Sequence, residues 1–356
     1  MIKCIFVGDV MPGSNRIEEK ISPDLAENLA FSDFIFGNLE SPFVRKTPSV
    51  LNLDKIPLWS TAENLTLLKQ LKFTHFCLNN NHIYDLYENG LDDSIELLYN
   101  AGFAIFGLNY KGISQLEIVE KYGIRLGVIA FNWVQSQFSN HLFKDANEIN
   151  LKKIKKSVDF LICFLHWGDD HNIFINMDQQ KEARKLIDQG VDLIIGSHPH
   201  VPQGWEKYKE KYIFYSLGNF IFTPKEKYSY LPYKIRYDDQ RENILFQRKE
   251  CKIGLYVSIQ FDKRSYKLLE VKPIYRQNTL PCILPAKLND FYLQMKKRMN
   301  SQIKDSNFSI NDNYKKKILI KYTIPLIFKN PLYWPIFLKK LTSSKSYWFF
   351  KNIKIP

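Results

Sequence analysis

The sequence has few cysteines and lacks the motifs of several large enzyme classes. Five cysteines occur among its 356 residues, and no two of them form a CxxC pair. An odd number without a recognisable framework is typical of a reducing compartment. Cys4, Cys77 and Cys163 lie within apolar runs, where cysteine usually behaves as a small buried hydrophobic residue. A P-loop, a GxGxxG fingerprint and a GxSxG nucleophile elbow are also absent, which disfavours the chemistry that these motifs serve.

Long apolar segments are missing as well. No run reaches the roughly 18 apolar residues that a membrane-spanning helix requires. The first strand-like run begins at Ile2, so we expect no signal peptide. These two absences predict a cytoplasmic protein, with any membrane contact peripheral and at the inner surface.

The net charge of +13 is concentrated at one end of the chain. Residues 287–356 contain 15 Lys and Arg against three Asp and Glu and carry +12, whereas residues 1–286 carry +1. A nearly neutral main region gives no electrostatic support for nucleic-acid binding, so we expect no such partner. Residues 315–356 mix lysines with aromatic residues, which suits contact with an anionic membrane surface. The alternative is a helical extension that packs on the main domain with its lysines in solvent.

Apolar, β-rich runs alternate with amphipathic segments along most of the chain. This order predicts an α/β fold with much parallel pairing. The strand-like runs are Ile2–Val7, Phe34–Phe36, Thr74–Leu78, Leu126–Phe131, Phe160–Leu165, Val191–Ile195, Tyr212–Tyr215, Gly254–Phe261 and Lys267–Tyr275. Prolines cluster between Pro273 and Pro285. We therefore predict a main domain over residues 1–285 and a basic, aromatic-rich extension over residues 286–356.

Three helices are predicted between these runs. Residues 60–63, with the sequence STAE, have the pattern of a capping box ahead of a helix that contains Leu65. Residues 91–100 and 177–189 show helical spacing of apolar residues and are followed by Gly102 and Gly190. Residues 228–252 have no clear period and predict a long loop over one face, as part of a substrate cleft.

Polar residues of a metal-binding type stand where several predicted strands end. In α/β folds these ends form the ligand sites. Asp, Glu, Asn and His suit hard to borderline ions such as Mn²⁺, Fe and Zn²⁺, so we predict a centre for one or two divalent ions. Each residue alone can also be explained as a turn cap or a buried histidine. The GSHPH string, with His198 and His200, is the strongest single motif, and the prediction as a whole depends on the shared position of all these residues. The candidate ligands are Asp9, Glu40, Asn81, His166, His198 and His200.

Two further residues are candidates for proton transfer. His82, beside Asn81, could contact substrate or protonate a leaving group. Asp85 lies three residues later and could fix the tautomer of His82, so we predict both as catalytic. The remaining histidines fit the pattern less well and are left out: His75, His141 and His171, the last being interpreted as a rim group or a solvated loop residue.

The same residues carry a resemblance to a known family. The strings GDVM, NLESP, NNNHIYD, HWG, GVDLIIGSHPHV and IFYSLGNFIF occur in this order between Phe6 and Phe222. They resemble the CapA family of bacterial capsule and poly-γ-glutamate synthesis proteins, which is similar to calcineurin-like metallophosphoesterases. The stretch from GSHPHV to YSLGNFIF is the most specific part. The resemblance implies a four-layer α/β/β/α sandwich with its metal centre at the strand ends.

The resemblance also implies roles for individual residues. Asp9 and His200 would hold one ion, and Asn81, His166 and His198 a second. Glu40 would bridge the two ions, with Asn38 as the other candidate for the bridge, and His82 would face the substrate. The residues predicted to contribute to substrate binding are Asn38, Asp170 and Asn219.

Two departures from the family pattern concern the centre itself. Metallophosphoesterases carry Asp-x-His in the first motif, whereas this chain has Asp9-Val10-Met11, so the first ion position loses an imidazole. The family also tends to have Glu where this chain has Asp170, after HWG.

We therefore predict a metal-dependent hydrolase of the phosphoesterase type in capsule or cell-surface polymer biosynthesis. Its substrate would be anionic or phosphorylated, or a precursor of a capsule-type polymer. The alternative is a non-catalytic polymer-binding or scaffold component of a capsule-synthesis complex.

Overall fold

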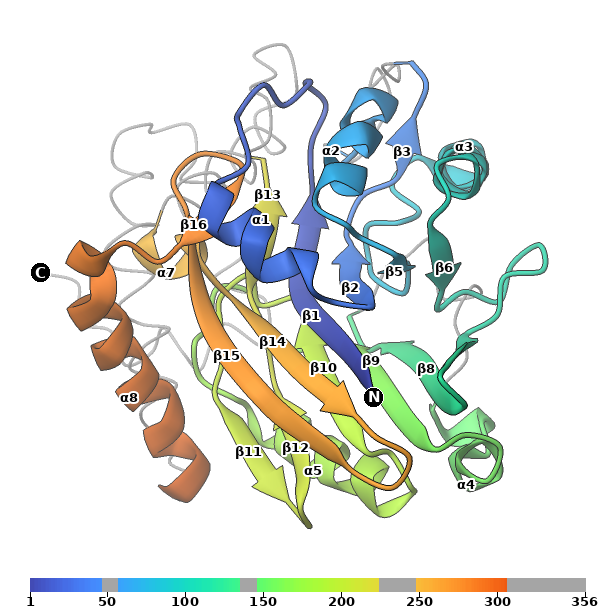
Figure 1. Ribbon diagram of the computed structural model, residues 1–356, viewed down its shortest axis with the longest axis vertical. Helices are drawn as coiled ribbons and strands as arrows, with labels where there is room; N and C mark the ends of the chain where they lie inside the picture. The colour runs from blue at the N-terminus through green and yellow to red at the C-terminus, as the bar shows by residue number, and fades with distance from the viewer. Residues whose placement is uncertain (47–56, 135–145, 224–247, 306–356) are drawn as a thin grey trace, which may run out of the picture.

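Two mixed β-sheets form the centre of the computed structural model, which describes residues 1–46, 57–134, 146–223 and 248–305 (Figure 1). The first sheet has eight strands in the order β16-β15-β14-β1-β2-β5-β6, with β13 also paired to β1. Their bounds are β1 Ile2–Met11, β2 Phe34–Leu39, β5 His75–Cys77, β6 Ala104–Phe106, β13 Asn219–Phe222, β14 Ile253–Phe261, β15 Tyr266–Arg276 and β16 Pro281–Ile283. The neighbours β1, β2, β5 and β6 are parallel, and β14, β15 and β16 are antiparallel.

The second sheet has six strands in the order β11-β12-β10-β9-β8-β7. Their bounds are β7 Leu116–Lys121, β8 Ile124–Asn132, β9 Phe160–His166, β10 Leu193–Ser197, β11 Trp205–Tyr208 and β12 Lys211–Phe214. The four inner strands are parallel, and both edge strands are antiparallel to their neighbours. A short pair, β3 (Phe43–Val44) and β4 (Ser60–Thr61), stands apart. The predicted α/β class with extensive parallel pairing is confirmed.

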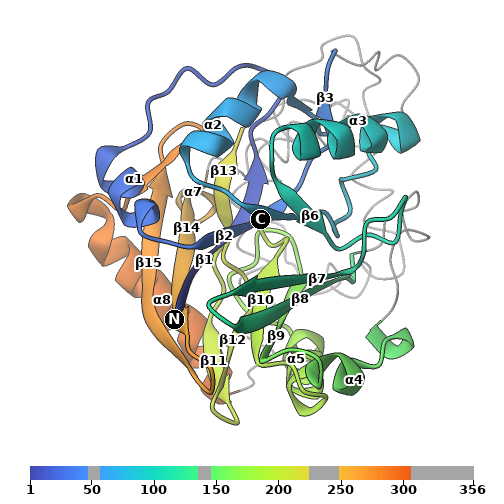
Figure 2. The same ribbon diagram turned by 45° about the vertical axis from the view of Figure 1, so that its right-hand side comes forward.

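The sheets face each other across a shared apolar core. The aromatic rings of Phe6 and Phe36, from the first sheet, meet Phe164 of the second, with ring centroids 6.1 and 6.4 Å apart. Helices cover the outer faces of both sheets: α1 (Pro23–Ala30), α2 (Leu65–Gln70) and α3 (Tyr87–Asn100) on the first, α4 (Leu151–Lys155) and α5 (Met177–Asp188) on the second (Figure 2). Strands buried on both faces explain why the central runs are apolar throughout.

Of the predicted helix boundaries, the capping box is wrong. Ser60 and Thr61 form β4, a 3-10 turn follows over Ala62–Asn64, and α2 begins only at Leu65. The Ser60 hydroxyl accepts a hydrogen bond from the Gly13 amide at 2.9 Å, so it serves a distant loop rather than a helix end. A true capping box lies at the start of α5, where Asn176 and Gln179 cap each other.

The C-terminal part of the described chain packs on the same core. Helix α8 (Asn289–Asp305) runs beside β15 and β11 (Figure 1). It buries Tyr292, Met295 and Met299 in the cluster between the sheets. The proposed division at residue 285 remains a prediction. Part of the predicted loop over residues 228–252, and the whole tail over 315–356, lie outside the described residues, although Lys249–Lys252 form the short helix α7. Among the described helices, none has the length and apolar character needed to cross a membrane.

Candidate metal centre

The predicted metal ligands converge at the carboxyl ends of strands from both sheets. In the first sheet Asp9 stands opposite Asn38 of β2 and Asn219 of β13. In the second sheet His166, the last residue of β9, stands opposite Ser197 of β10. Parallel strands end at the same edge, which is why residues distant in sequence meet there: the backbone amide of His198, 189 positions after Asp9, donates to Asp9 Oδ2 at 3.3 Å.

One group of ligands consists of Asp9, Glu40 and His200. The His200 ring places Nδ1 3.5 Å from Asp9 Oδ2 and Nε2 3.5 Å from Glu40 Oε1. Asn38 donates to Asp9 Oδ1 at 2.8 Å, and Asn219 Oδ1 lies 2.9 Å from His200 Nδ1. The ligand atoms of the group all lie within 4.8 Å of one another, a spacing that could hold one ion.

A second group shares Glu40 with the first. It contains His166 and His198, again with all ligand atoms within 4.8 Å of one another. His166 Nε2 lies 3.7 Å from Glu40 Oε1 and 2.8 Å from Asn81 Oδ1. His166 Nδ1, on the opposite side of the ring, lies 3.0 Å from Ser197 Oγ. Glu40 is thus common to the two ligand groups.

Burial disfavours the charged forms of the side chains in the two ligand groups. Desolvation raises the pKa of Asp9 to about 7, and it raises that of Glu40 well above its usual range, with the neighbouring Asp9 charge adding to the effect. Desolvation also lowers the pKa of His198 and of His200 to about 3, so both imidazoles are neutral near pH 7. Neutral imidazoles beside buried carboxylates form a donor set that suits a divalent cation.

Orphaned polar atoms give an independent test of that fit. Both carboxylate oxygens of Glu40 and Nδ1 of His198 are buried without a hydrogen-bond partner among the residues that the structure describes. An unpaired buried polar atom usually costs about 1–3 kcal/mol. The three atoms belong to the two ligand groups, so a bound cation would satisfy what the protein leaves unpaired. The residues present therefore fit one or two divalent ions.

The local backbone is adapted to bring these side chains together. His198 and His200 adopt positive φ angles of 94° and 56°, which are strained for residues other than glycine. At Gly8 a Cβ atom would lie 1.8 Å from the carbonyl oxygen of Gly218. Glycine at this position lets β13 approach β1, and the Asp9 amide then donates to Gly218 at 2.9 Å.

His82 and Asp85 form the pair that the sequence suggested. Their Nδ1 and Oδ2 atoms are 2.9 Å apart; the Asp85 side chain is 1% exposed and that of His82 18%. Asp85 Oδ2 also accepts from the Leu58 amide at 2.9 Å, which fixes the carboxylate. His82 is therefore the more accessible member, held by a buried acid. Their catalytic roles remain predictions.

The three residues predicted to bind substrate differ in accessibility. Asn38 and Asn219 are each 1% exposed and hydrogen-bond to Asp9 and His200, respectively. Their amides are thus placed to orient ligands, and substrate contact by them stays a prediction. The side chain of Asp170 is 60% exposed, and its Oδ1 lies 3.1 Å from His198 Nε2.

Two of the excluded histidines can be placed. His75 is buried and stacks on Phe36 with centroids 4.6 Å apart, and desolvation lowers its pKa to about 4. The interpretation of His171 as a rim or solvated residue is wrong, because it is 5% exposed and its Nδ1 lies 3.6 Å from Cys251 Sγ. The loop after β9 folds back over β10 and carries it inward. His141 lies outside the described residues.

Sequence reasoning missed two supporting residues. Asn80 is fully buried; it donates to the Leu39 carbonyl at 2.7 Å and accepts from the amides of His82 and Ile83. It shapes the turn that presents Asn81 and His82, and the only signal was its place within the NNNH string. Ser197 is the second, and its Oγ lies 3.0 Å from His166 Nδ1.

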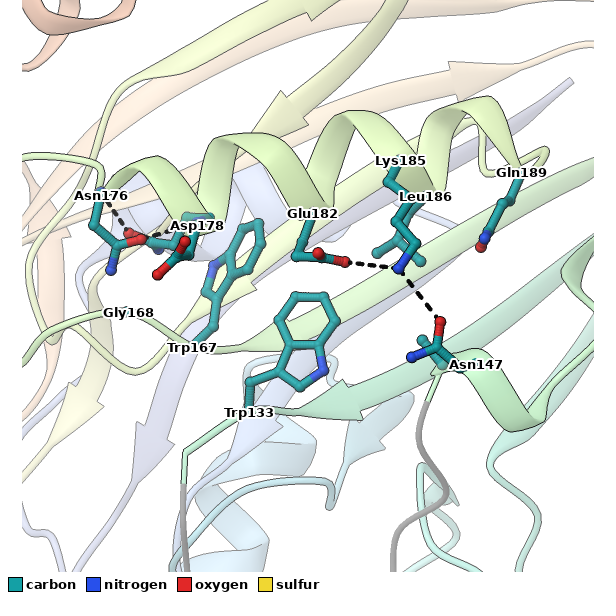
Figure 3. Close-up of a pocket in the computed structure, with 12 residues that line it drawn as sticks. Trp133, Asn147, Trp167, Gly168, Asn176, Asp178, Glu182, Lys185, Leu186 and Gln189 are labelled. Carbon is teal, nitrogen blue, oxygen red and sulfur yellow. Dashed lines mark hydrogen bonds and ion pairs between the residues drawn. The ribbon is translucent and has the colours of Figure 1, made fainter. Parts of the chain in front are cut away.

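A cavity of about 390 Å³ lies on the outer side of the second sheet (Figure 3). It runs along α5, and Trp133 and Trp167 form part of its wall. Lys185 Nζ donates to Glu182 Oε2 and to Asn147 Oδ1, at 3.3 Å in each case. None of its lining residues belongs to the ligand groups, although Trp167 directly follows His166.

One known family matches most of the part of the chain that carries the ligand groups. The sequence profile described as "Bacterial capsule synthesis protein PGA_cap" matches residues 3–224. Curated relatives include "Capsule biosynthesis protein CapA" of Bacillus anthracis, 29% identical over 241 residues, 61% of this chain and 59% of that protein. "PGA biosynthesis protein CapA" of Bacillus subtilis (strain 168) is 29% identical over 244 residues, 62% of this chain and 63% of that protein. The match spans about three fifths of the length of these relatives.

Solved structures with a similar fold include two phosphate-ester hydrolases by title. A "novel phosphatase" from Mycoplasma pneumoniae has a TM-score of 0.49 and 14% identity, covering 83% of this chain and 98% of that one. A 5'-nucleotidase precursor from Thermus thermophilus has a TM-score of 0.45 and 14% identity, covering 85% of this chain and 60% of that one.

Proposed function

This chain belongs to the PGA_cap family of bacterial capsule synthesis proteins, and we propose that it is a metal-dependent hydrolase of the phosphoesterase type. Its place would be in the biosynthesis of a capsule or another cell-surface polymer. Its substrate would be an anionic or phosphorylated molecule, or a precursor of the polymer. The arrangement of two facing sheets with helices on both outer faces is assigned here to the four-layer α/β/β/α sandwich of metallophosphoesterases.

The observation that carries the proposal is the convergence of two ligand groups on one buried carboxylate. Glu40 lies 3.5 Å from His200 Nε2 and 3.7 Å from His166 Nε2 and has no hydrogen-bond partner of its own. A solvated surface cluster would not leave such a group unpaired. A structural zinc site usually has four protein ligands, often cysteines, and no open position. The buried Cys77 and Cys163 lie in the core and not among these groups.

Each group of residues has a distinct task in this proposal. Asp9, Glu40 and His200 would hold one ion, and Glu40, Asn81, His166 and His198 the other. Divalent ions bound there would lower the pKa of a water molecule to roughly 7 and offset negative charge on a phosphoester.

Proton transfer falls to the His82–Asp85 pair. The Asp85 carboxylate accepts from His82 Nδ1, which leaves Nε2 for a leaving-group oxygen or a substrate hydrogen bond. With a side chain 18% exposed, His82 can be reached by substrate, whereas the ligand imidazoles of His166, His198 and His200 are nearly fully buried.

A second candidate function is a non-catalytic one, in which the protein binds polymer or organises a synthesis complex. The supporting observation is Met11, which occupies the position of the first-motif histidine of metallophosphoesterases. It is 2% exposed and packs with Leu58 and Phe222. The first ion would then have fewer nitrogen ligands, and weak occupancy would favour binding over turnover.

One experiment separates metal binding from its absence. Purified protein loaded with Mn²⁺ or Zn²⁺ should contain one or two ions per chain by elemental analysis, and the double variant His198→Ala/His200→Ala should contain none. His75→Gln, which alters a buried histidine outside the ligand groups, is the matched control and should keep the wild-type stoichiometry. An unchanged metal content in the double variant would refute the assignment.

A phosphatase screen with Mn²⁺ then separates the two candidate functions. Turnover that disappears in His82→Ala supports the enzyme. Polymer binding by a metal-loaded protein that shows no turnover supports the scaffold.

Membrane contact through residues 315–356 and a cytoplasmic location are further proposals, which rest on composition alone. Flotation of the protein with anionic liposomes, with and without residues 315–356, tests the contact. Equal flotation of both forms would contradict it.

A further inference from the structure

The loop that follows β9 holds one acidic side chain against a buried ligand candidate. Asp170 Oδ1 lies 3.1 Å from Nε2 of His198. The Asp170 side chain is 60% exposed, whereas that of His198 is 7% exposed, so the contact joins the mouth of the site to its interior. Together with His200, the two residues form a third set whose candidate ligand atoms lie within 4.8 Å of one another.

The backbone fixes this contact on both sides of Asp170. The Trp167 amide donates to the Ser197 carbonyl at 3.2 Å, and the His171 amide donates to the Pro199 carbonyl at 2.8 Å. These bonds fasten the loop to the residues on either side of His198. The carboxylate of Asp170 is therefore placed by the fold, even though its side chain is largely exposed.

The chemistry of the imidazole decides what the contact does. A neutral imidazole has one N–H and one lone pair. An ionised carboxylate only accepts hydrogen bonds, so Nε2 of His198 must carry the proton where it meets Asp170. The lone pair then belongs to Nδ1, and Nδ1 is the atom that is buried without a hydrogen-bond partner.

The other two imidazoles each place one ring nitrogen beside a supporting side chain and the other toward Glu40. His166 has Nδ1 beside Ser197 Oγ and His200 has Nδ1 beside Asn219 Oδ1, at 3.0 and 2.9 Å. Their Nε2 atoms face Glu40. His198 differs from them, because its Nε2, and not its Nδ1, lies beside a supporting side chain, that of Asp170.

We propose that Asp170 is a positioning residue that holds His198 in the Nε2–H tautomer and so presents its Nδ1 lone pair to the ion shared with Glu40 and His166. The inference rests on the proposed function, because it assumes that a divalent ion binds in this group. A carboxylate hydrogen-bonded to a ligating histidine in this way fixes the ring and raises its basicity, and its loss typically costs about 10–100-fold in metal affinity.

Two pairs of variants test the role of Asp170. Asp170→Leu removes the acceptor, and Asp170→Asn removes the charge while keeping a carbonyl oxygen. Asp169→Leu and Asp169→Asn are comparison variants on the same loop, since the Asp169 carboxylate faces Asn172 at 3.5 Å and its charge raises the pKa of His198. Binding of Zn²⁺ alone is measured by titration calorimetry in all four variants and the wild type.

We expect Asp170→Leu to weaken Zn²⁺ binding at the group that contains His198 by roughly 10–100-fold and Asp170→Asn to weaken it less, whereas both Asp169 variants should show only the smaller effect of a lost charge. Nitrogen-15 spectra of the histidine rings of the metal-free protein supply a readout that a merely structural role would not move. The His198 resonances, assigned by their loss in His198→Gln, should show Nε2–H in the wild type and a tautomer mixture in Asp170→Leu.

The outcomes distinguish failure of the role inferred for Asp170 from failure of the proposed metal centre. If Asp170→Leu binds Zn²⁺ like Asp169→Leu and the His198 tautomer is unchanged, the role of Asp170 is refuted while the metal centre stands. If His198→Gln also binds Zn²⁺ like the wild type, the metal centre itself is refuted.

Discussion

Replacing Asp9 by asparagine should stabilise the metal-free protein at alkaline pH although it removes a ligand. Burial raises the pKa of Asp9 from 3.8 to about 7. Between these values the folded protein keeps a proton that the unfolded chain has released, so its stability falls as the pH rises. A shift of roughly three pKa units corresponds to about 4 kcal/mol of lost stability once the pH exceeds the folded-state value.

The asparagine variant escapes this loss because its side chain does not ionise. The oxygen of the new amide can still accept from Asn38, as Asp9 Oδ1 does at 2.8 Å. The hydrogen bond from the His198 amide to Asp9 Oδ2 is lost, which lowers the free energy of unfolding of the variant by about 1 kcal/mol. That term does not depend on pH, so it leaves the pH-dependent difference intact.

Urea denaturation in the presence of a chelator measures the effect. The free energy of unfolding of Asp9→Asn minus that of the wild type should grow by roughly 3 kcal/mol between about pH 4.5 and about pH 8. Glu40 does not cancel in the difference, because removing the Asp9 charge lowers the raised pKa of Glu40, and this adds to the gain at alkaline pH. Groups that do not interact with Asp9 cancel. Asp290→Asn, at an exposed position in α8 and outside the ligand groups, is the matched control. A difference for Asp9→Asn that is equal at both pH values would refute the reasoning.

Three further substitutions test the packing and the site. Phe164→Ala empties the core between the sheets and should cost about 3–5 kcal/mol by urea denaturation, whereas a cost below about 1 kcal/mol would contradict the core assignment. Gly8→Ala forces a methyl group against the Gly218 carbonyl and should destabilise the fold by more than the roughly 1–3 kcal/mol of ordinary overpacking; wild-type stability would disprove the close approach. Asn219→Ala leaves His200 Nδ1 without its amide partner and should weaken one Zn²⁺ site by about 10–100-fold in calorimetry, with unaltered affinity as the contrary result.

Strands that are buried on both faces could be predicted from the sequence, because their runs are apolar throughout. The strand β9 was expected over Phe160–Leu165 and is found over Phe160–His166. The edge strand β7, Leu116–Lys121, was missed because only Val119 is buried in it and its pattern does not alternate. The extension of β1 to Met11 depends on pairing with β13, more than 200 residues later, which no local pattern reveals.

The candidate site could be predicted because polar residues of metal-binding types share one position, the end of a predicted strand. His166, His198 and His200 were found in this way, and their convergence with Asp9 and Glu40 follows from the parallel strands. The supporting contacts could not be found, because each joins residues distant in sequence.

Asn80 illustrates that limit. Its amide reaches the Leu39 carbonyl 41 positions away, and only the folded chain shows that bond. Ser60 illustrates the reverse error, because a local capping pattern was overridden by a hydrogen bond to Gly13.

The most direct test of the account is diffraction at the absorption edge of manganese, from crystals grown with Mn²⁺. An anomalous peak within coordination distance of the Glu40 carboxylate, shared with His200 on one side or with His166 and His198 on the other, is the predicted result. No peak within roughly 3 Å of Glu40 in metal-saturated crystals would contradict the central claim.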